Sequence, residues 1–320
     1  MKRRTLVLAM GAALAGPRAL GQAAKEPRRV ALLSVATEAS FASSLQAVRD
    51  GLRERGHVEG RDIVVDIRYA DGRAQELPRL AAELAALKPT VIIALGTLAT
   101  DAALAAAADA PIVSLGDLVA AGHAAQLGRP GGRVTGISFL PSPLNAKRLG
   151  LLAELLPKGS AVLNLGDPNS PIGMQSVEAA GHSLGLVLHA AYASTPAEID
   201  AAFARARKLR VVGINVLNSP FLSAEHARII QLAASAKLPA IYQWPETARD
   251  GGLMGYGPSL TAMFRQLAGF ASRILNGAKP GDLPIEQPTT FELVINLKAA
   301  KALGLPIPQS LLLRTDEVIQ

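Results

Sequence analysis

Short apolar segments alternate with amphipathic segments along almost the whole chain, and they do so in two successive series. The first series predicts strands at 29–35, 63–69, 91–95, 112–115 and 134–138, with helices between most of them. The second series follows residue 140 and repeats the pattern to about residue 256. Strands that alternate with helices form parallel sheets covered by helices on both faces. We therefore expect an α/β protein with two Rossmann-like lobes.

The end of the chain departs from this alternation. Apolar residues at spacings of three and four predict one packed helix, with Ser259 as its cap and Gly277 at its end; they are Leu260, Met263, Phe264, Leu267, Phe270 and Ile274. Three prolines within 280–288 then favour an extended segment. A last strand is predicted from Phe291.

This ending resembles the ABC transporter substrate-binding proteins of the tryptophan-binding type. The residues that carry the resemblance are Tyr-Gly-Pro-Ser-Leu at 256–260, Leu-Pro-Ile-Glu-Gln-Pro at 283–288 and the strand at 291–298, and the likeness extends over nearly the whole mature chain. It implies the type I periplasmic binding protein fold with three hinge crossings. The N-terminal lobe would comprise 24–139 plus 257–288, and the C-terminal lobe 140–256 plus 289–320.

The same resemblance implies a non-enzymatic function. The protein would be the extracytoplasmic substrate-binding component of an ABC importer, working as a monomer without a cofactor. Its partners would be a small-molecule ligand and an ABC permease with its ATPase. A ligand-sensing subunit of a signalling system is the alternative within this fold, and the export signal together with the absence of a helix-turn-helix segment disfavours a DNA-bound repressor.

The first 23 residues are typical of a secretory signal peptide. Lys2, Arg3 and Arg4 precede an apolar run of about a dozen residues, and small residues at 19–23 offer a cleavage site. The run is shorter than the roughly 20 residues of a membrane span. A buried first helix is the other interpretation, and the arginine pair also permits twin-arginine instead of general export. We expect a periplasmic protein that does not span the membrane after cleavage.

Composition excludes several other classes. The chain has no cysteine, so it has no disulfide, no thiol nucleophile and no cysteine for a lipoprotein anchor. The net charge is +7, and removing the four basic residues of the signal leaves +3. No nucleic-acid partner follows from so small a charge, because the basic residues near Arg205 lack interleaved aromatic residues.

One sequence motif resembles that of a catalytic site. Residues 181–185 match G-x-S-x-G around Ser183, which raises a secreted serine hydrolase as a second alternative. A nucleophile elbow requires a strand before the serine and a helix after it, whereas here a predicted helix precedes and a predicted strand follows. The five histidines show no metal-ligand spacing. We expect no catalytic residue and no metal site.

Ligands of open parallel sheets bind beyond the carboxyl ends of the strands, where helix N-termini begin. The residues at those positions form the predicted wall of the cleft. They are Thr37, Glu38, Ser40, Gly96, Thr97, Asp117, Asp167, Asn169, Asn218, Tyr242, Glu246 and Tyr256.

Each of these residues also has a purely structural interpretation. Ser40 and Thr97 suit helix caps, the Asp-Pro-Asn sequence at 167–169 suits a turn, and the two tyrosines suit the edge of a lobe. As a binding wall, the helix starts suit a carboxylate, the acids suit an ammonium group, and the aromatic rings suit an apolar body. An amino acid or a small organic acid is the expected ligand.

Overall fold

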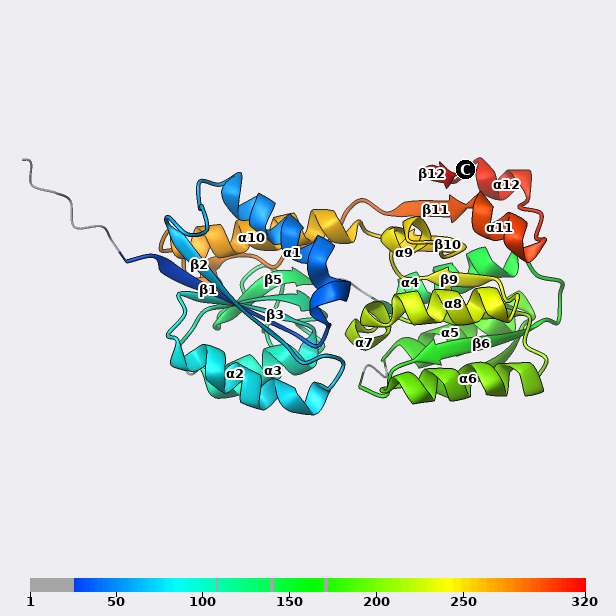
Figure 1. Ribbon diagram of the computed structural model, residues 1–320, viewed down its shortest axis with the longest axis horizontal. Coiled ribbons are helices and arrows are strands. Elements are labelled where there is room, and N and C mark those ends of the chain that lie inside the picture. The colour runs from blue at the N-terminus through cyan, green and yellow to red at the C-terminus, as the bar shows by residue number, and fades with distance from the viewer. Residues whose placement is uncertain (1–25, 108, 139–140, 170–171) are drawn as a thin grey trace, which may run out of the picture.

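The computed structural model describes residues 26–107, 109–138, 141–169 and 172–320, and the predicted signal peptide lies outside them. Two α/β lobes lie side by side along the long axis of the molecule (Figure 1). We call the lobe built on the five-stranded sheet the first lobe, and the lobe built on the seven-stranded sheet the second lobe. This is the fold class that the alternating pattern predicts.

The sheet of the first lobe has the order β2-β1-β3-β4-β5, and all its pairs are parallel. Apolar side chains fill both of its faces: Val30 and Leu32 of β1 pack on one side, and Ala31 and Leu33 on the other. Such a strand reads as a continuous apolar run because no face meets water. The strands are β1 (Arg28–Ser34), β2 (Ile63–Tyr69), β3 (Val91–Leu95), β4 (Ile112–Gly116) and β5 (Val134–Ser138).

Four helices cover that sheet in pairs. α1 (Glu38–Arg53) lies with α10 (Leu260–Leu275) on one face, and α2 (Leu77–Ala86) lies with α3 (Thr97–Ala106) on the other. A short 3₁₀ turn, η1 (Ala74–Glu76), leads into α2. No helix of the described chain lies between β4 and β5, and α10 supplies the cover at that edge by packing on β3, β4 and β5.

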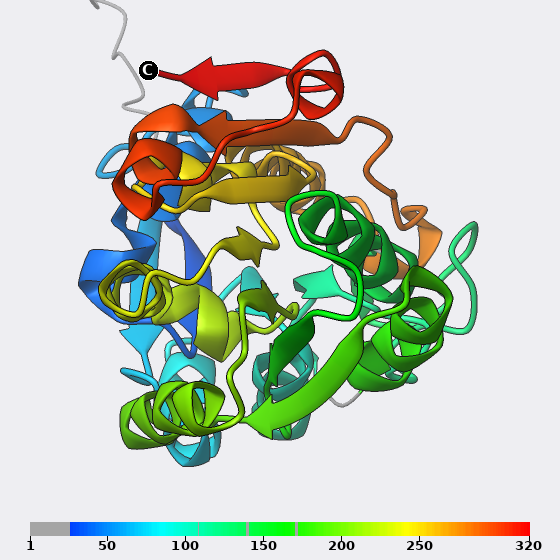
Figure 2. The ribbon, with the colours of Figure 1, turned by 90° about the vertical axis from the view of Figure 1, so that its right-hand side faces the viewer.

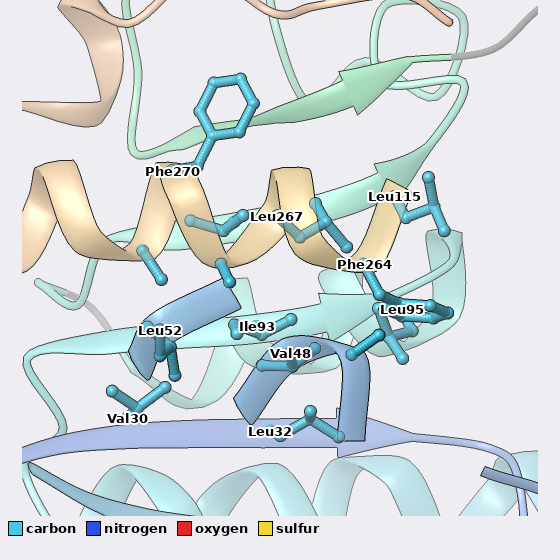
Figure 3. Close-up of a cluster of buried hydrophobic side chains, with 14 of the residues drawn as sticks. Val30, Leu32, Val48, Leu52, Ile93, Leu95, Leu115, Phe264, Leu267 and Phe270 are labelled. Atoms are coloured by element: carbon cyan, nitrogen blue, oxygen red, sulfur yellow. The ribbon is translucent and has the colours of Figure 1, made fainter. Parts of the chain in front are cut away.

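α10 therefore belongs to the core of the first lobe although it comes late in the sequence. Phe264 projects from it toward α1, and Phe270 projects on the opposite side toward β5, while Leu267 lies between them (Figure 3). Gly51 of α1 allows the two helices to approach closely, since a Cβ at that position would lie 2.8 Å from the Cβ of Ala268. Ser259 caps α10 by accepting from the Ala262 N–H, as predicted, and Gly277 follows with φ +96°.

The sheet of the second lobe has the order β12-β11-β10-β9-β8-β6-β7. Among the strand pairs of this sheet that the structure describes, only β10–β11 is antiparallel. The strands are β6 (Ala161–Gly166), β7 (Val187–Tyr192), β8 (Gly213–Val216), β9 (Ala240–Tyr242), β10 (Met254–Gly257), β11 (Glu292–Asn296) and β12 (Glu317–Ile319).

Helices again cover both faces of this sheet. In Figure 2, α6 and α8 lie on one side of it and α4 and α5 on the other. Smaller helices complete the lobe at its edges and beside the cleft. The bounds are α4 (Pro141–Ala153), α5 (Ile172–Leu184), α6 (Pro196–Lys208), α7 (Pro220–Ala224), α8 (His226–Ser235), α9 (Pro245–Arg249), α11 (Leu297–Leu303) and α12 (Gln309–Leu312).

The chain passes between the lobes three times. It leaves the first sheet after β5, returns from β10 into α10, and crosses again through the 3₁₀ turn η2 (Pro280–Asp282) and the extended segment before β11. In that segment Glu286 exchanges backbone hydrogen bonds with Gly136 and Ser138 of β5. The three crossings agree with the predicted topology, and the proposed lobe boundaries remain a prediction.

Some elements differ from those predicted. The repeating pattern predicts one helix between β8 and β9, whereas the structure has two, α7 and α8, which meet at Glu225. The Ser219 side chain caps α7 and Pro220 occupies its first position, so the helix starts earlier than the apolar stripe indicates. α9, α11, α12 and β12 were not predicted, because elements of three to seven residues show no measurable periodicity.

Candidate ligand-binding cleft

Two cavities lie between the lobes. Cavity 1 has a volume of about 240 Å³ and is lined by the ends of β3 and β4, the start of α3, and loops of the second lobe. Cavity 2, of about 130 Å³, is lined by α1, α7, α9 and α10. Both cavities share five wall residues, which therefore lie at their boundary: Leu95, Gly96, Leu115, Asn218 and Pro220.

Most of the residues predicted for the site line one of these cavities. Cavity 1 is lined by Gly96, Thr97, Asp117, Asp167, Asn169 and Asn218. Cavity 2 is lined by Ser40, Glu246 and again by Gly96 and Asn218. The described walls of the two cavities do not include Thr37, Glu38, Tyr242 or Tyr256. Eight of the residues predicted from the strand ends thus lie together at the interlobe cavities, and they come from both lobes, whereas the other four do not line a cavity.

The N-terminus of α3 is the most distinctive feature of cavity 1. Gly96 precedes the helix with φ +85° and provides no capping side chain. The backbone N–H groups of Thr97, Leu98 and Ala99 have no hydrogen-bond partner among the described residues, and all three residues line the cavity. Free N–H groups at the positive end of a helix dipole form an anion site. Cavity 1 can therefore hold a carboxylate here.

The start of α1 is different, because its own side chains satisfy it. The Thr37 hydroxyl accepts from the Ser40 N–H at 3.1 Å, and the Ser40 hydroxyl accepts from the Thr37 N–H at 3.2 Å. This reciprocal arrangement is a capping box. Glu38 occupies the first turn of the same helix, where a negative charge stabilises the helix dipole. Thr37, Ser40 and Glu38 thus have structural functions, and of the three only Ser40 lines a cavity.

Two carboxylates line cavity 1, and they differ in how many hydrogen bonds they already accept. Asp117 follows β4, and its carboxylate accepts only from the Ala120 N–H, at 3.3 Å, among the described groups. Asp167 is 4% exposed, and both of its oxygens are occupied: one accepts from the Asn169 N–H at 2.8 Å and the other from the Ser219 hydroxyl at 2.6 Å. Asp117 is therefore the better acceptor for an ammonium group, whereas Asp167 holds the loop that carries Asn169.

Glu246 lines cavity 2 and also bonds to the start of α10, where the chain returns to the first lobe. Its Oε1 accepts from the Thr261 N–H at 3.2 Å and the Ser259 hydroxyl at 3.3 Å, both at the start of α10. Its Oε2 is buried and has no partner within the described part of the chain. The guanidinium of Arg249, 3.9 Å from Oε1, bonds to Glu292 and Glu317 instead. One carboxylate oxygen of this residue is left free to accept.

The two tyrosines predicted for the cleft lie in the second lobe's core. Tyr242 is 3% exposed and packs among the residues around α6 and α8, and burial raises the pKa of its phenol. Tyr256 stacks on Phe291 with ring centroids 6.3 Å apart, and the Lys147 ammonium lies 4.5 Å from its ring centroid. Both tyrosines lie at the carboxyl-end side of their strands, β9 and β10, and neither lines a cavity.

A buried arginine connects the hinge strands. Arg148 of α4 is 1% exposed and donates to the Tyr256 carbonyl at 2.6 Å, the Gln243 carbonyl at 3.2 Å and the Asn145 side-chain oxygen at 2.7 Å. Burial lowers its pKa to about 9, so the guanidinium stays charged at neutral pH. It fixes the ends of β9 and β10 to the helix that follows the first crossing.

Several wall residues were not predicted. Pro220 and Phe221 of α7 reach across the interlobe space: a Cβ on Gly96 would lie 2.8 Å from Pro220 Cγ, and one on Gly72 3.8 Å from Phe221. The sequence also did not predict that three aromatic side chains meet in the wall of cavity 2. They are Phe41, Trp244 and Phe264. The Asn-Ser-Pro sequence at 218–220 is a cap motif that could have placed α7 beside the cleft.

Ser183 lies at the end of α5, and its hydroxyl donates to the Ala180 carbonyl at 2.9 Å. Gly185, with φ +66°, ends the helix before β7. The order is helix, serine, strand, as predicted, and it is the reverse of a nucleophile elbow.

The residues that the structure describes contain no group of three metal-ligating side chains. In the same part of the chain we find no helix with the length and apolar character of a membrane span.

Two α/β lobes, three crossings and an interlobe cleft define a solute-binding protein of the type I periplasmic fold. The sequence model of the family described as ABC transporter substrate binding protein matches residues 29–319. The chain belongs to this family.

Individual relatives agree with that assignment. A tyrosine-binding protein of Clostridioides difficile is 24% identical over 88% of this chain and 82% of its own length. A conserved domain protein from Vibrio cholerae is 25% identical with a TM-score of 0.83, covering 92% of this chain and 100% of the other. An ABC domain from Streptococcus pneumonia, solved with L-Trp, is 23% identical with a TM-score of 0.81 over the same shares.

Proposed function

We propose that this protein is the extracytoplasmic substrate-binding component of an ABC importer and that it delivers an amino acid or similar small organic acid to a permease with its ATPase. The single observation that carries the ligand class is the uncapped start of α3 in cavity 1. Three N–H groups there have no hydrogen-bond partner among the described residues and can donate to an anion. Asp117 lies on the wall of the same cavity and can accept from an ammonium group. A carboxylate and an ammonium together are the head group of an amino acid.

The relatives support an amino acid over other acids. One is named for tyrosine and another was solved with L-Trp. At 23–24% identity these names do not transfer residue by residue, so they support a class of ligand. L-tyrosine and L-tryptophan are accordingly the first ligands to test.

Capture would depend on closure of the lobes. Wall residues come from both lobes, and Gly96 and Pro220 are in contact, which is the arrangement expected of a shut cleft. A ligand shifts an open–closed equilibrium only as far as it binds the closed state better. Contacts from Asn218 and Asn169 to a ligand seated on α3 would supply that difference. The closed form would then be the one presented to the permease.

Export is part of the proposal. The basic residues, the short apolar run and the small residues at 19–23 support cleavage of a signal peptide and release into the periplasm without a lipid anchor. Mass spectrometry of the protein from a periplasmic extract should find a mature end near residues 22–24. An intact Met1 end in that extract would refute the cleavage.

Calorimetry on the purified mature protein tests the ligand class. L-tyrosine and L-tryptophan are compared with their amides, which keep the ammonium group and side chain but lack the carboxylate. Loss of a charge-assisted hydrogen-bond partner should weaken the amides at least about tenfold. If neither free amino acids nor other small organic acids bind, the proposed function fails. If the amides bind as tightly as the acids, α3 is not the carboxylate site.

A further inference from the structure

Trp244 belongs to the second lobe by its place in the chain and to the first lobe by its packing. It lies between β9 and α9, in the part of the chain that builds the seven-stranded sheet. Its side chain is 6% exposed and is part of the buried cluster that α1, α10 and the five-stranded sheet enclose. Every other buried residue described for that cluster comes from the first lobe. The indole therefore crosses the boundary between the lobes.

The backbone that carries this side chain is tied to the second lobe. Pro245 follows Trp244 at the first position of α9, where its fixed φ favours the helix start. At the other end of this short helix, Arg249 donates to Glu292 at 2.8 Å and to Glu317 at 2.9 Å. These two acids belong to β11 and β12. The base of the indole is thus joined to the second sheet on two sides.

Hydrogen bonds within the second lobe also determine the direction of the ring. The indole N–H donates to the Ser223 hydroxyl of α7 at 2.9 Å, and this hydroxyl donates to the Ser219 carbonyl at 2.8 Å. The Gln243 amide bonds to the same hydroxyl. A side chain that is already held in one orientation loses little conformational entropy when it packs against a partner.

The first lobe supplies an apolar wall for this ring. Phe41 of α1 and Phe264 of α10 line cavity 2 together with Trp244, and the two phenyl rings lie edge to face with centroids 5.3 Å apart. Leu95 and Leu115, at the same end of the cluster as Phe264 (Figure 3), also line this cavity. Separation of the lobes would take the indole away from this wall and expose apolar surface to water, which is unfavourable.

We propose that Trp244 is a latch that favours the closed arrangement of the lobes before a ligand binds. Its contacts join side chains of the protein itself, so they stabilise closure whether or not a ligand is present. The apparent affinity of a ligand scales with the fraction of protein in the competent state, and the latch should therefore strengthen the binding of every ligand by one common factor. This inference rests on the closure step of the proposed function and not on the class of ligand.

Two simpler functions of Trp244 would give different results. An indole that only fills the core would contribute to stability, and shortening it would leave the shape of the ligand-free protein unchanged. An indole that only contacts the ligand would affect different ligands unequally, again without a change in the ligand-free shape. The shape of the ligand-free protein is therefore the decisive measurement.

Small-angle scattering on the extensively dialysed mature protein measures that shape. Trp244→Leu should have a larger radius of gyration than the parent, because its lobes separate for more of the time. Phe264→Leu, which shortens the wall that receives the indole, should enlarge the radius as well. Phe270→Leu is the matched control: it makes the same substitution in the same helix and cluster, but Phe270 projects toward β5 and is not among the described residues that line cavity 2. Its radius should equal that of the parent.

Fluorescence gives a second measurement, because Trp244 is the single tryptophan of the chain. Acrylamide should quench the ligand-free folded parent much less than the parent unfolded in urea, and a saturating ligand should change this quenching little. Calorimetry gives a third. Trp244→Leu should weaken the binding of L-tyrosine and L-tryptophan by the same factor, up to about tenfold.

The latch would be overturned by a parental radius in Trp244→Leu, by an equal increase in Phe270→Leu, or by quenching of the folded parent as strong as in urea. Unequal losses of affinity for the two amino acids would overturn it too. If calorimetry finds that neither amino acids nor other small organic acids bind, the proposed function fails, while scattering and quenching on the ligand-free protein still decide the latch.

Discussion

Pro220 of the second lobe packs against the bare α-carbon of Gly96 in the first, so closely that a Cβ on Gly96 would come within 2.8 Å of the proline ring. Gly96 also has φ +85° with ψ 167°, a conformation that costs other residues about 1–3 kcal/mol. Both requirements coincide at the boundary between the two cavities. The residue at this position thus governs how near the lobes can come.

Gly96→Ala should hinder closure. The added methyl group would push Pro220 away, so we expect ligand affinity to fall at least about tenfold and the ligand-induced decrease in radius of gyration to shrink in small-angle scattering. Gly72→Ala is the control, since it has a similar φ of +78° while its Cβ would meet Phe221 only at 3.8 Å. Equal losses in the two variants would show that backbone strain, and not the contact with Pro220, is responsible.

Asp117→Asn should weaken amino-acid binding about 10- to 100-fold, because the neutral amide loses its charge-assisted bond to the ammonium group. The affinity for the deaminated analogue, such as 3-(4-hydroxyphenyl)propionate in place of L-tyrosine, should not fall. Calorimetry with both ligands checks this. Asp200→Asn, an exposed acid of α6 that pairs with Arg228, should change neither value. A matching loss for the deaminated compound would remove Asp117 from the head-group site.

Arg148→Lys should destabilise the second lobe by about 2–4 kcal/mol, since a single ammonium cannot reach all three of the buried oxygens that the guanidinium bonds. Urea unfolding gives the free energy. Arg133→Lys is the control, because Arg133 also donates to three carbonyls, those of Leu104, Ala107 and Ala110, but is less buried. A loss in the control as large as in Arg148→Lys would contradict the importance of burial.

His57 should make the stability depend on pH. Burial first, and the nearby Arg28 second, lower its pKa below 6.5, while Asp62 raises it in part; the ring also bonds to the Ser272 hydroxyl at 2.9 Å. A lowered folded-state pKa means that the unfolded chain binds the proton better. Its contribution is therefore full above pH 6.5 and is lost as the pH falls below it. Urea unfolding at neutral pH and at about pH 5 should show a smaller acid loss in His57→Gln. Identical losses in the two proteins would exclude this group.

Much of the fold could be predicted from local pattern. Runs such as 30–33 read as buried strands because successive side chains enter opposite cores, and the stripe from Leu260 to Ile274 predicted a packed helix. The pattern does not carry information on short elements such as α9, or on the break at Glu225, where capping by Ser219 decides the helix start.

The site was predicted less completely, for a geometric reason. The end of a strand determines where a residue lies along the sheet, and this placed Gly96, Asp117 and Asn218 beside the cavities. It does not determine the face to which a side chain points. Tyr242 is the last residue of β9, and its ring turns into the second lobe's core. Pro220 was missed because its significance depends on a residue of the other lobe.

The late position of α10 has a consequence for the order in which the protein can acquire its structure. A ribosome completes β1 to β5 by residue 138, yet the helix that covers one face of that sheet is finished only at residue 275. Until then α1 alone covers that face, and Leu32, Ile93 and their neighbours lack the part of their core that α10 supplies. The nascent first lobe consequently stays incomplete while most of the chain is being made, and its core can close only after the strands β6 to β10 of the second lobe have been synthesised.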